Sequence, residues 1–249
     1  MDYFLTIAAS DNSGGAGIQQ DMKVAHNLDY WALSAITGIT VQNFDKVFAV
    51  EAVKPDLLKS QIMQCLQSFQ VKVIKIGAIC SYENIQVIAE CLNDFPVKHV
   101  VLDPVLFASD GTTLSGTNSL SLLIKKLFPL TELITPNRHE FELLTNKKIG
   151  SIEDGIEIAI DKCREWNTSI LLKGGHFNSP VINEAIITPK DIFRFRHERK
   201  TFSYSHGTGC TLSSALACFI GKNNSLCDSY SLATNFLVNH FEELQINRL

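Results

Sequence analysis

The chain has 249 residues, of which 45% are hydrophobic and 19% charged, so it can bury a core and is too apolar for a disordered protein. Its formal net charge of −4 gives no support for a surface that binds polyanions. The 7 cysteines are scattered and contain no Cys-x-x-Cys pair, which argues against a disulfide framework and against a zinc site.

Other features of the sequence predict where the protein resides. The N-terminus lacks a basic region before its apolar run, and no apolar run approaches the roughly 20 residues of a membrane helix. Free thiols are typical of a reducing compartment. The one basic segment, at 194–200, alternates with aromatic residues, which favours a solvated hairpin over a nucleic-acid or membrane contact. We therefore expect a cytoplasmic protein with no nucleic-acid partner and no membrane contact.

Short apolar runs alternate with segments that carry an apolar stripe at helical spacing. In chain order the predicted elements are a strand (3–9), helix (16–28), strands (34–41, 47–53), helix (55–69), strand (71–79), helix (81–95), strand (97–102), helix (119–128), strand (130–135), helices (139–145, 152–166), strands (169–172, 181–188, 192–199) and helices (211–220, 226–244).

This alternation predicts an α/β fold, with a mostly parallel central sheet and helices on both faces. No linker, repeat or low-complexity stretch divides the sequence, so residues 1–249 are expected to form a single domain. Polar or glycine clusters follow four predicted strands, at 11–15, 103–104, 136–137 and 173–176. Ligands of such folds bind beyond the carboxyl ends of the strands, and these clusters are therefore the candidate site.

The segment with the strongest chemical signal is Gly207-Thr208-Gly209-Cys210, which opens a predicted helix. The backbone N–H groups of such a turn can point into an anion, and the helix dipole adds positive potential. Cys210 falls in the first turn, where a thiolate is stabilised, so it could accept a proton from an alcohol or attack an electrophile. The local residues fit a phosphate-binding turn and a structural turn around a buried cysteine equally well.

The run Ser13-Gly14-Gly15-Ala16-Gly17 follows the first predicted strand. It lacks the spacing of a dinucleotide-binding loop, and the chain contains no P-loop. It could bring the backbone close to a flat ligand, with Asp11 and Asp21 nearby. A tight strand-to-helix turn is the interpretation that these residues alone favour.

Two further motifs contain charges suited to a nucleotide. Asn137 and Glu140 share one face at a helix start, where they could hold Mg²⁺ and its waters with Asp103, although helix capping alone explains them and is favoured. Lys173 ends a buried strand, which is a costly place for a charge unless an anion such as phosphate is bound. His176 beside it could contact a ligand, but a hydrogen-bonded loop histidine is the commoner case.

The order of these motifs resembles the ribokinase-like superfamily, and within it the hydroxymethylpyrimidine/phosphomethylpyrimidine kinase branch. The segments that carry the resemblance, of which the first and last are highly specific, are 6–23, 40–43, 75–77, 101–105, 134–137, 173–176 and 206–213. The resemblance implies a ribokinase-like kinase of thiamine biosynthesis. Its expected substrates are MgATP and an aminopyrimidine alcohol, 4-amino-5-hydroxymethyl-2-methylpyrimidine, with the monophosphate of that alcohol as a second acceptor.

The resemblance also implies a role for each motif. Gly207, Thr208, Gly209 and Cys210 would form the catalytic anion hole, with Cys210 taking the hydroxymethyl proton. The ATP and metal residues implied are Asn137, Lys173, Asp103 and Glu140. The substrate residues implied are Gly15, Asp21 and Gln42, of which Gln42 suits an aminopyrimidine because its amide both donates and accepts hydrogen bonds.

Departures from the family pattern keep other interpretations open. Ala78 stands where a methionine is common, so a roomier pocket keeps pyridoxal or pyridoxine as an alternative substrate. Asn12 stands where a proline or serine is usual. Ser109, followed by Asp110, stands where a lysine could face phosphate, so whether the monophosphate is also phosphorylated stays open. A binding protein that lost the chemistry, and a cysteine hydrolase with His206 as base, are the remaining alternatives. Relatives in the branch are dimeric, so we expect a homodimer, with the edge strands as candidate contacts.

Overall fold

The computed structural model of the chain describes residues 1–107, 111–112, 114, 119–175, 177, 180–202 and 206–246. Ser109, Asp110 and His176, which the sequence singles out, lie outside these residues.

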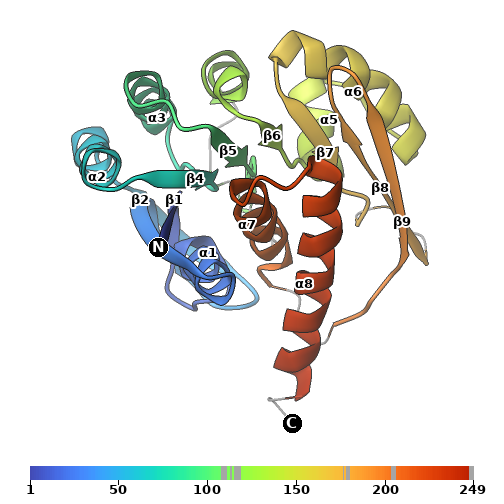
Figure 1. Cartoon of the computed structure of the whole chain (residues 1–249), viewed down its shortest axis with the longest axis horizontal. Coiled ribbons are helices and arrows are strands. Elements are labelled where there is room, and N and C mark those ends of the chain that lie inside the picture. Colours follow the sequence, from blue (N-terminus) through green and yellow to red (C-terminus); the bar gives the residue numbers. More distant parts are fainter. Residues whose placement is uncertain are drawn as a thin grey trace.

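Within the described residues, one nine-stranded sheet runs through the molecule in the order β3-β2-β1-β4-β5-β6-β7-β8-β9 (Figure 1). The strands are β1 (Asp2–Asp11), β2 (Tyr30–Gln42), β3 (Val47–Ala52), β4 (Val71–Ile76), β5 (His99–Leu102), β6 (Leu133–Ile134), β7 (Ser169–Leu172), β8 (Val181–Ile187) and β9 (Ile192–Glu198). The six central strands β2, β1, β4, β5, β6 and β7 pair in parallel, whereas β3 at one edge and β8 and β9 at the other are antiparallel. The predicted mostly parallel sheet is therefore confirmed.

Helices cover both faces of this sheet (Figure 1). They are α1 (Gly17–Asn27), α2 (Pro55–Ser68), α3 (Tyr82–Asp94), α4 (Leu120–Leu122), η2 (Leu123–Leu127), η3 (Phe128–Leu130), α5 (Arg138–Thr145), α6 (Ile152–Trp166), α7 (Thr208–Gly221) and α8 (Leu226–Ile246). One core contains side chains of α1, α7 and α8, and the other contains side chains of α2, α3, α5 and α6. No helix in the described part of the chain is long and apolar enough to cross a membrane.

Successive strand residues supply the two cores in turn. Phe4 and Val73 pack in the core under α1, α7 and α8, and their neighbours Leu5 and Ile74 pack in the opposite core. This alternation follows from the twofold period of a strand, and burial on both faces explains why the strands read as continuous apolar runs.

The structure differs from the expected elements mainly at one helix. The predicted helix at 119–128 is divided into the α-helical turn α4, the π-helical turn η2 and the 3-10 turn η3. Pro129 lies in η3 and has no N–H to donate, so regular α-helical bonding cannot continue through it. The strand predicted at 71–79 ends at Ile76, because the chain then leaves the sheet at Gly77.

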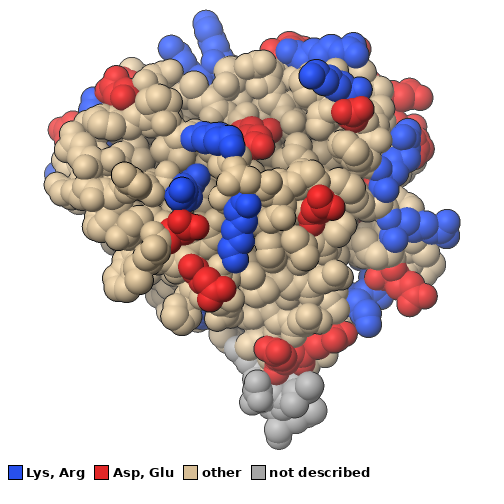
Figure 2. All heavy atoms as spheres, viewed as in Figure 1, with Lys and Arg blue, Asp and Glu red and all other residues tan. Residues whose placement is uncertain are grey.

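The strand order reverses between β1 and β4, since β2 and β3 lie on one side of β1 and β4 to β9 on the other. Ligands of open parallel sheets bind at such a reversal, beyond the carboxyl ends of the strands. The Asp11 loop follows β1 there, and Gly77 follows β4. On the face shown in Figure 2, basic and acidic side chains are interspersed, so its described residues present no continuous basic stripe.

Candidate active site

A cavity of about 1040 Å³ lies at the carboxyl ends of the parallel strands. Every residue that the sequence predicts for the site lines it, except Gly15 and Asp21. The structure thus gathers residues from the ends of β2, β5, β6 and β7 and from the start of α7 around one space.

Gly207 is the residue that joins the start of α7 to the first glycine loop. Its φ of 85° lies in the left-handed region, and a Cβ there would overlap the carbonyl oxygen of Gly15. Gly15 therefore contributes by packing beneath the turn. A side chain at Gly207 would push the two loops apart.

The N-terminus of α7 faces the cavity. Thr208, Gly209 and Cys210 form the first turn of the helix, where N–H groups have no intrahelical acceptor. Among the described residues no side chain caps the helix at Gly207, and all three residues line the cavity. This arrangement can bind an anion such as a phosphoryl group.

The thiol of Cys210 is neutral in this environment. Burial raises its pKa to about 11, and the negative charges of Asp21 and Asp103 act in the same direction, while Lys75 and the backbone N–H of Gly17 oppose them. Desolvation thus opposes the thiolate that the helix position alone favours.

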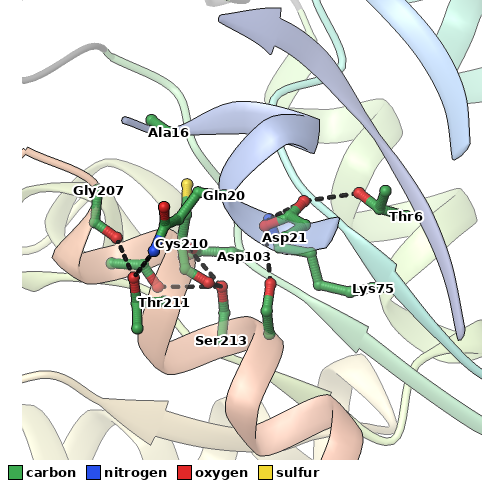
Figure 3. Close-up of polar contacts among 12 residues, drawn as sticks. Thr6, Ala16, Gln20, Asp21, Lys75, Asp103, Gly207, Cys210, Thr211 and Ser213 are labelled. Carbon is green, nitrogen blue, oxygen red and sulfur yellow. Dashed lines mark hydrogen bonds and ion pairs between the residues drawn. The ribbon is translucent and has the colours of Figure 1, made fainter. Parts of the chain in front are cut away.

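A buried ion pair joins Lys75 of β4 to Asp21 of α1 (Figure 3). Lys75 Nζ lies 2.8 Å and 2.9 Å from the two carboxylate oxygens of Asp21, which also accept hydrogen bonds from Thr6 (2.6 Å) and Ser214 (2.7 Å). Asp21 is fully buried and holds Lys75, and Lys75 lines the cavity. Lys75 is a cavity residue to which the sequence motifs assigned no role, although a lysine within the apolar run of β4 was a usable signal.

Asp103 and Lys173 form a second ion pair inside the cavity. Lys173 Nζ lies 2.9 Å from Asp103 Oδ1, which also accepts from Thr135 (3.0 Å), while Oδ2 accepts from Ser213 on α7 (3.2 Å). A Cβ on Gly209 would lie 3.9 Å from Lys173 Nζ, so this pair borders the first turn of α7. The lysine at the strand end is thus balanced by a carboxylate and still faces the cavity.

Asn137 and Glu140 form the capping box that their spacing predicts. Glu140 N–H donates to Asn137 Oδ1 (3.0 Å), and Asn137 N–H donates to Glu140 Oε2 (2.8 Å). Burial raises the pKa of Glu140 to about 7, Lys173 opposes this shift, and Asp103 adds to it. Both residues also line the cavity, so the capping and functional interpretations are compatible.

The acidic pair of Asp103 and Glu140 is the only predicted metal site. In the part of the chain that the structure describes, no group of three or more His, Cys, Asp and Glu side chains is arranged to hold a metal ion. Two carboxylates suit Mg²⁺, which binds few protein oxygens and keeps several waters.

Asp11 organises the glycine loop after β1. Its carboxylate accepts hydrogen bonds from the N–H groups of Ser13 (2.7 Å), Gly15 (3.1 Å) and Ala16 (2.7 Å), and it lies 3.1 Å from His206 Nε2. Burial raises the pKa of Asp11, but the hydrogen bonds from His206, Ser13 and Ala16 outweigh burial and leave the pKa well below its usual range. Asp11 therefore fixes the loop and connects it to the segment that enters α7.

Gln42 lines the cavity at the end of β2. Its backbone N–H donates to Asn12 Oδ1 (2.8 Å), and Thr40 donates from the same strand to the carbonyl of Ser10 (2.9 Å). Asn12, which departs from the expected pattern, thus ties the end of β2 to the first loop.

Comparisons with known proteins agree on one family. A family model described as phosphomethylpyrimidine kinase matches residues 11–248. The hydroxymethylpyrimidine/phosphomethylpyrimidine kinase of Rhizobium meliloti is 35% identical over 234 residues, which cover 94% of this chain and 88% of that protein. Two bifunctional thiamine-biosynthesis proteins, from Arabidopsis thaliana and Geobacter sulfurreducens, are 33% and 34% identical, and the chain spans 45% and 48% of their lengths.

Solved structures show the same fold. The phosphomethylpyrimidine kinase of Clostridium difficile superposes with a TM-score of 0.85 at 31% identity, covering 96% of this chain and 99% of that one. The ADP complex of Staphylococcus aureus pyridoxal kinase gives a TM-score of 0.88 at 26% identity, covering 97% and 88%. The resemblance inferred from the motifs is therefore confirmed at the level of family and fold.

Proposed function

The chain belongs to the phosphomethylpyrimidine kinase family, and from this premise we propose that it transfers the γ-phosphoryl group of ATP to a pyrimidine alcohol. The first acceptor is the hydroxymethyl group of 4-amino-5-hydroxymethyl-2-methylpyrimidine, and the second acceptor is the monophosphate formed in that step, as the names of the relatives indicate. The observation that supports this proposal most is that the first turn of α7, which no described side chain caps, faces the same cavity as Lys173.

The proposed chemistry depends on positioning and electrostatics. Phosphoryl transfer passes through a loose transition state with charge on the equatorial oxygens, so fixed donors contribute more than covalent chemistry. The N–H groups of Thr208, Gly209 and Cys210 bind those oxygens, and Lys173 neutralises the phosphates. The proton of the attacking hydroxyl goes to Cys210 Sγ, and only the ionised fraction of this thiol can accept it.

Asp103 and Glu140 would hold Mg²⁺, because they offer the hard oxygen ligands that this ion prefers. When bound, the ion neutralises charge on the nucleotide phosphates. Asn137 positions Glu140 through the capping box and adds a side chain to the nucleotide end of the cavity.

The pyrimidine lies between Gln42 and the loop that Asp11 organises. The Gln42 amide both donates and accepts hydrogen bonds, as an aminopyrimidine requires.

A second candidate substrate, pyridoxal, is favoured by one observation: Ala78 lines the cavity with a small side chain, and pyridoxal kinases share the fold. Incubation with ATP and each of the three acceptors, followed by product mass, separates the candidates. Pyridoxal phosphate as the main product would overturn the pyrimidine assignment.

The chain forms a homodimer in this proposal, with the outer surface of β2 and β3 as the contact. Ile39, Val41 and Phe48 are 54%, 56% and 63% exposed there, at an edge of the sheet that an unpartnered protein would keep polar. Light scattering is expected to give twice the chain mass for the wild type and the mass of a single chain for Phe48→Glu.

All cysteines are free, which fits the proposed cytoplasmic location.

A further inference from the structure

The turn that carries Lys173 out of β7 is held by side chains from β8, β9 and α8. The backbone N–H of Gly174 donates to Glu184 Oε1 on β8 at 2.8 Å. A Cβ on Gly174 would overlap the carbonyl oxygen of Asn183, so the turn lies directly against β8. The position of Lys173 therefore depends on a neighbouring strand as well as on its own.

Glu184 is itself held rigidly. Its side chain is 8% exposed, and its second oxygen, Oε2, accepts a hydrogen bond from Tyr230 Oη on α8 at 2.5 Å. Tyr230 is buried and stacks on Phe195 of β9, with ring centroids 3.9 Å apart. Both carboxylate oxygens thus have structural partners, and Tyr230 of α8 fixes the carboxylate that holds Gly174.

The carbonyl side of the same turn is held from the end of β9. Arg199 Nη1 donates to the carbonyl oxygen of Gly175 (3.0 Å), and Nη2 donates to that of Phe177 (2.7 Å). Glu184 therefore binds a backbone N–H group of the turn, and Arg199 binds two of its backbone carbonyl groups. Lys173 immediately precedes this turn. Its side chain is 13% exposed, and its ammonium faces Asp103.

We propose that Glu184 is a positioning residue for Lys173, acting through Gly174 to set where the lysine ammonium meets the nucleotide phosphates. This inference rests on the proposed kinase function. Lys173 Nζ borders the first turn of α7, so phosphates bound there lie between the ammonium and the helix N–H groups. Loss of the Glu184 acceptor leaves a buried N–H without a partner and releases the turn.

Two substitutions at position 184 distinguish an effect of side-chain length from an effect of side-chain charge. Glu184→Asp keeps the charge but is one methylene too short to reach Gly174 N–H. Glu184→Gln removes the charge and keeps an oxygen at the right distance. If Glu184 acts through the Gly174 hydrogen bond, the Asp variant is impaired and the Gln variant is rescued.

The experiment measures ADP affinity by calorimetry and KM for ATP and for the pyrimidine, with thermal unfolding as the check on folding. We expect Glu184→Asp to raise the Kd of ADP and the KM of ATP about tenfold, the cost of one lost hydrogen bond to a charged group. Glu184→Gln is expected to stay within about threefold of wild type, and both variants to keep the KM of the pyrimidine.

Other results overturn the inference in distinct ways. An impaired Gln variant beside a normal Asp variant would mean that Glu184 acts by its charge. Equal losses in both KM values together with a lower Tm would mean a merely structural role. Wild-type protein that binds no ADP would remove the proposed kinase function itself. If the Asp variant does not fold, Tyr230→Phe replaces it, and an unchanged Kd for ADP there counts against the inference.

Discussion

The ammonium of Lys75 lies 2.8 Å from Asp21 Oδ1, and both side chains are completely buried beneath the cavity that Cys210 lines. The positive charge lowers the pKa of the Cys210 thiol and the negative charge raises it, so the two members of the pair oppose each other at the sulfur. Burial is the largest influence on this pKa and raises it to about 11, which keeps the thiol mostly protonated at neutral pH.

Breaking this pair is expected to destabilise the fold strongly. Asp21→Asn leaves Lys75 buried without a counter-charge, which costs roughly 3–5 kcal/mol of unfolding free energy. Denaturant unfolding measures the loss, and the double variant Asp21→Asn with Lys75→Met is expected to recover much of it. Glu90→Gln, which breaks the exposed pair with Lys59, is the control and should leave the Tm near wild type. A similar Tm for Asp21→Asn and wild type would refute the argument.

Cys210 is expected to matter more for turnover than for binding. Cys210→Ser lowers kcat by about 100-fold or more, the usual contribution of a positioned acid or base, and changes the KM values far less. Steady-state kinetics with ATP and the pyrimidine measure both constants. Cys227→Ser, which changes a partly buried cysteine of α8, is the matched control. An unchanged kcat in Cys210→Ser would remove this residue from the mechanism.

The pH dependence of turnover follows from the raised pKa of Cys210, about 11. A thiol below its pKa gains ionised fraction as pH rises, by about tenfold per pH unit. If the thiolate accepts the substrate proton, kcat of the wild type rises between about pH 7 and 9, and that of Cys210→Ser does not. A wild-type profile that falls over this range would contradict the assignment.

Gly207 is expected to tolerate no side chain. Gly207→Ala combines a left-handed φ with an overlap against the Gly15 carbonyl, so both the Tm and the activity should fall sharply. Gly14→Ala is the matched control, because Gly14 has a φ of 75° but only the flexible Lys23 ammonium within reach of a Cβ. Equal thermal shifts in the two variants would show that the contact with Gly15 is unimportant.

Local signals in the sequence predicted much of the fold and part of the site. Ser81 precedes a helix and caps it, since Asn84 N–H donates to its hydroxyl at 3.1 Å. Asn137 and Glu140 form the expected capping box. Such motifs are readable because every partner lies within a few residues, and the strands are readable because they are buried on both faces.

Contacts between side chains that are far apart in the sequence could not be predicted from it. Asp21 and Lys75 are 54 positions apart, and Glu184 and Tyr230 are 46 apart, so neither pair leaves a local pattern. The same reason explains why the raised pKa of Cys210 could not be predicted: its helix position is local, but the burial that raises its pKa comes from the whole fold. The roles given to Gln42 and Gly15 stay predictions.

The most direct test of the account is to follow the γ-phosphoryl group itself. Wild-type protein is incubated with MgATP labelled in the γ-phosphate and with 4-amino-5-hydroxymethyl-2-methylpyrimidine, and the products are separated by mass. We expect label in the pyrimidine monophosphate, and then in the diphosphate as the monophosphate is phosphorylated in turn. ATP left intact, or hydrolysed without label in any pyrimidine product, would contradict it.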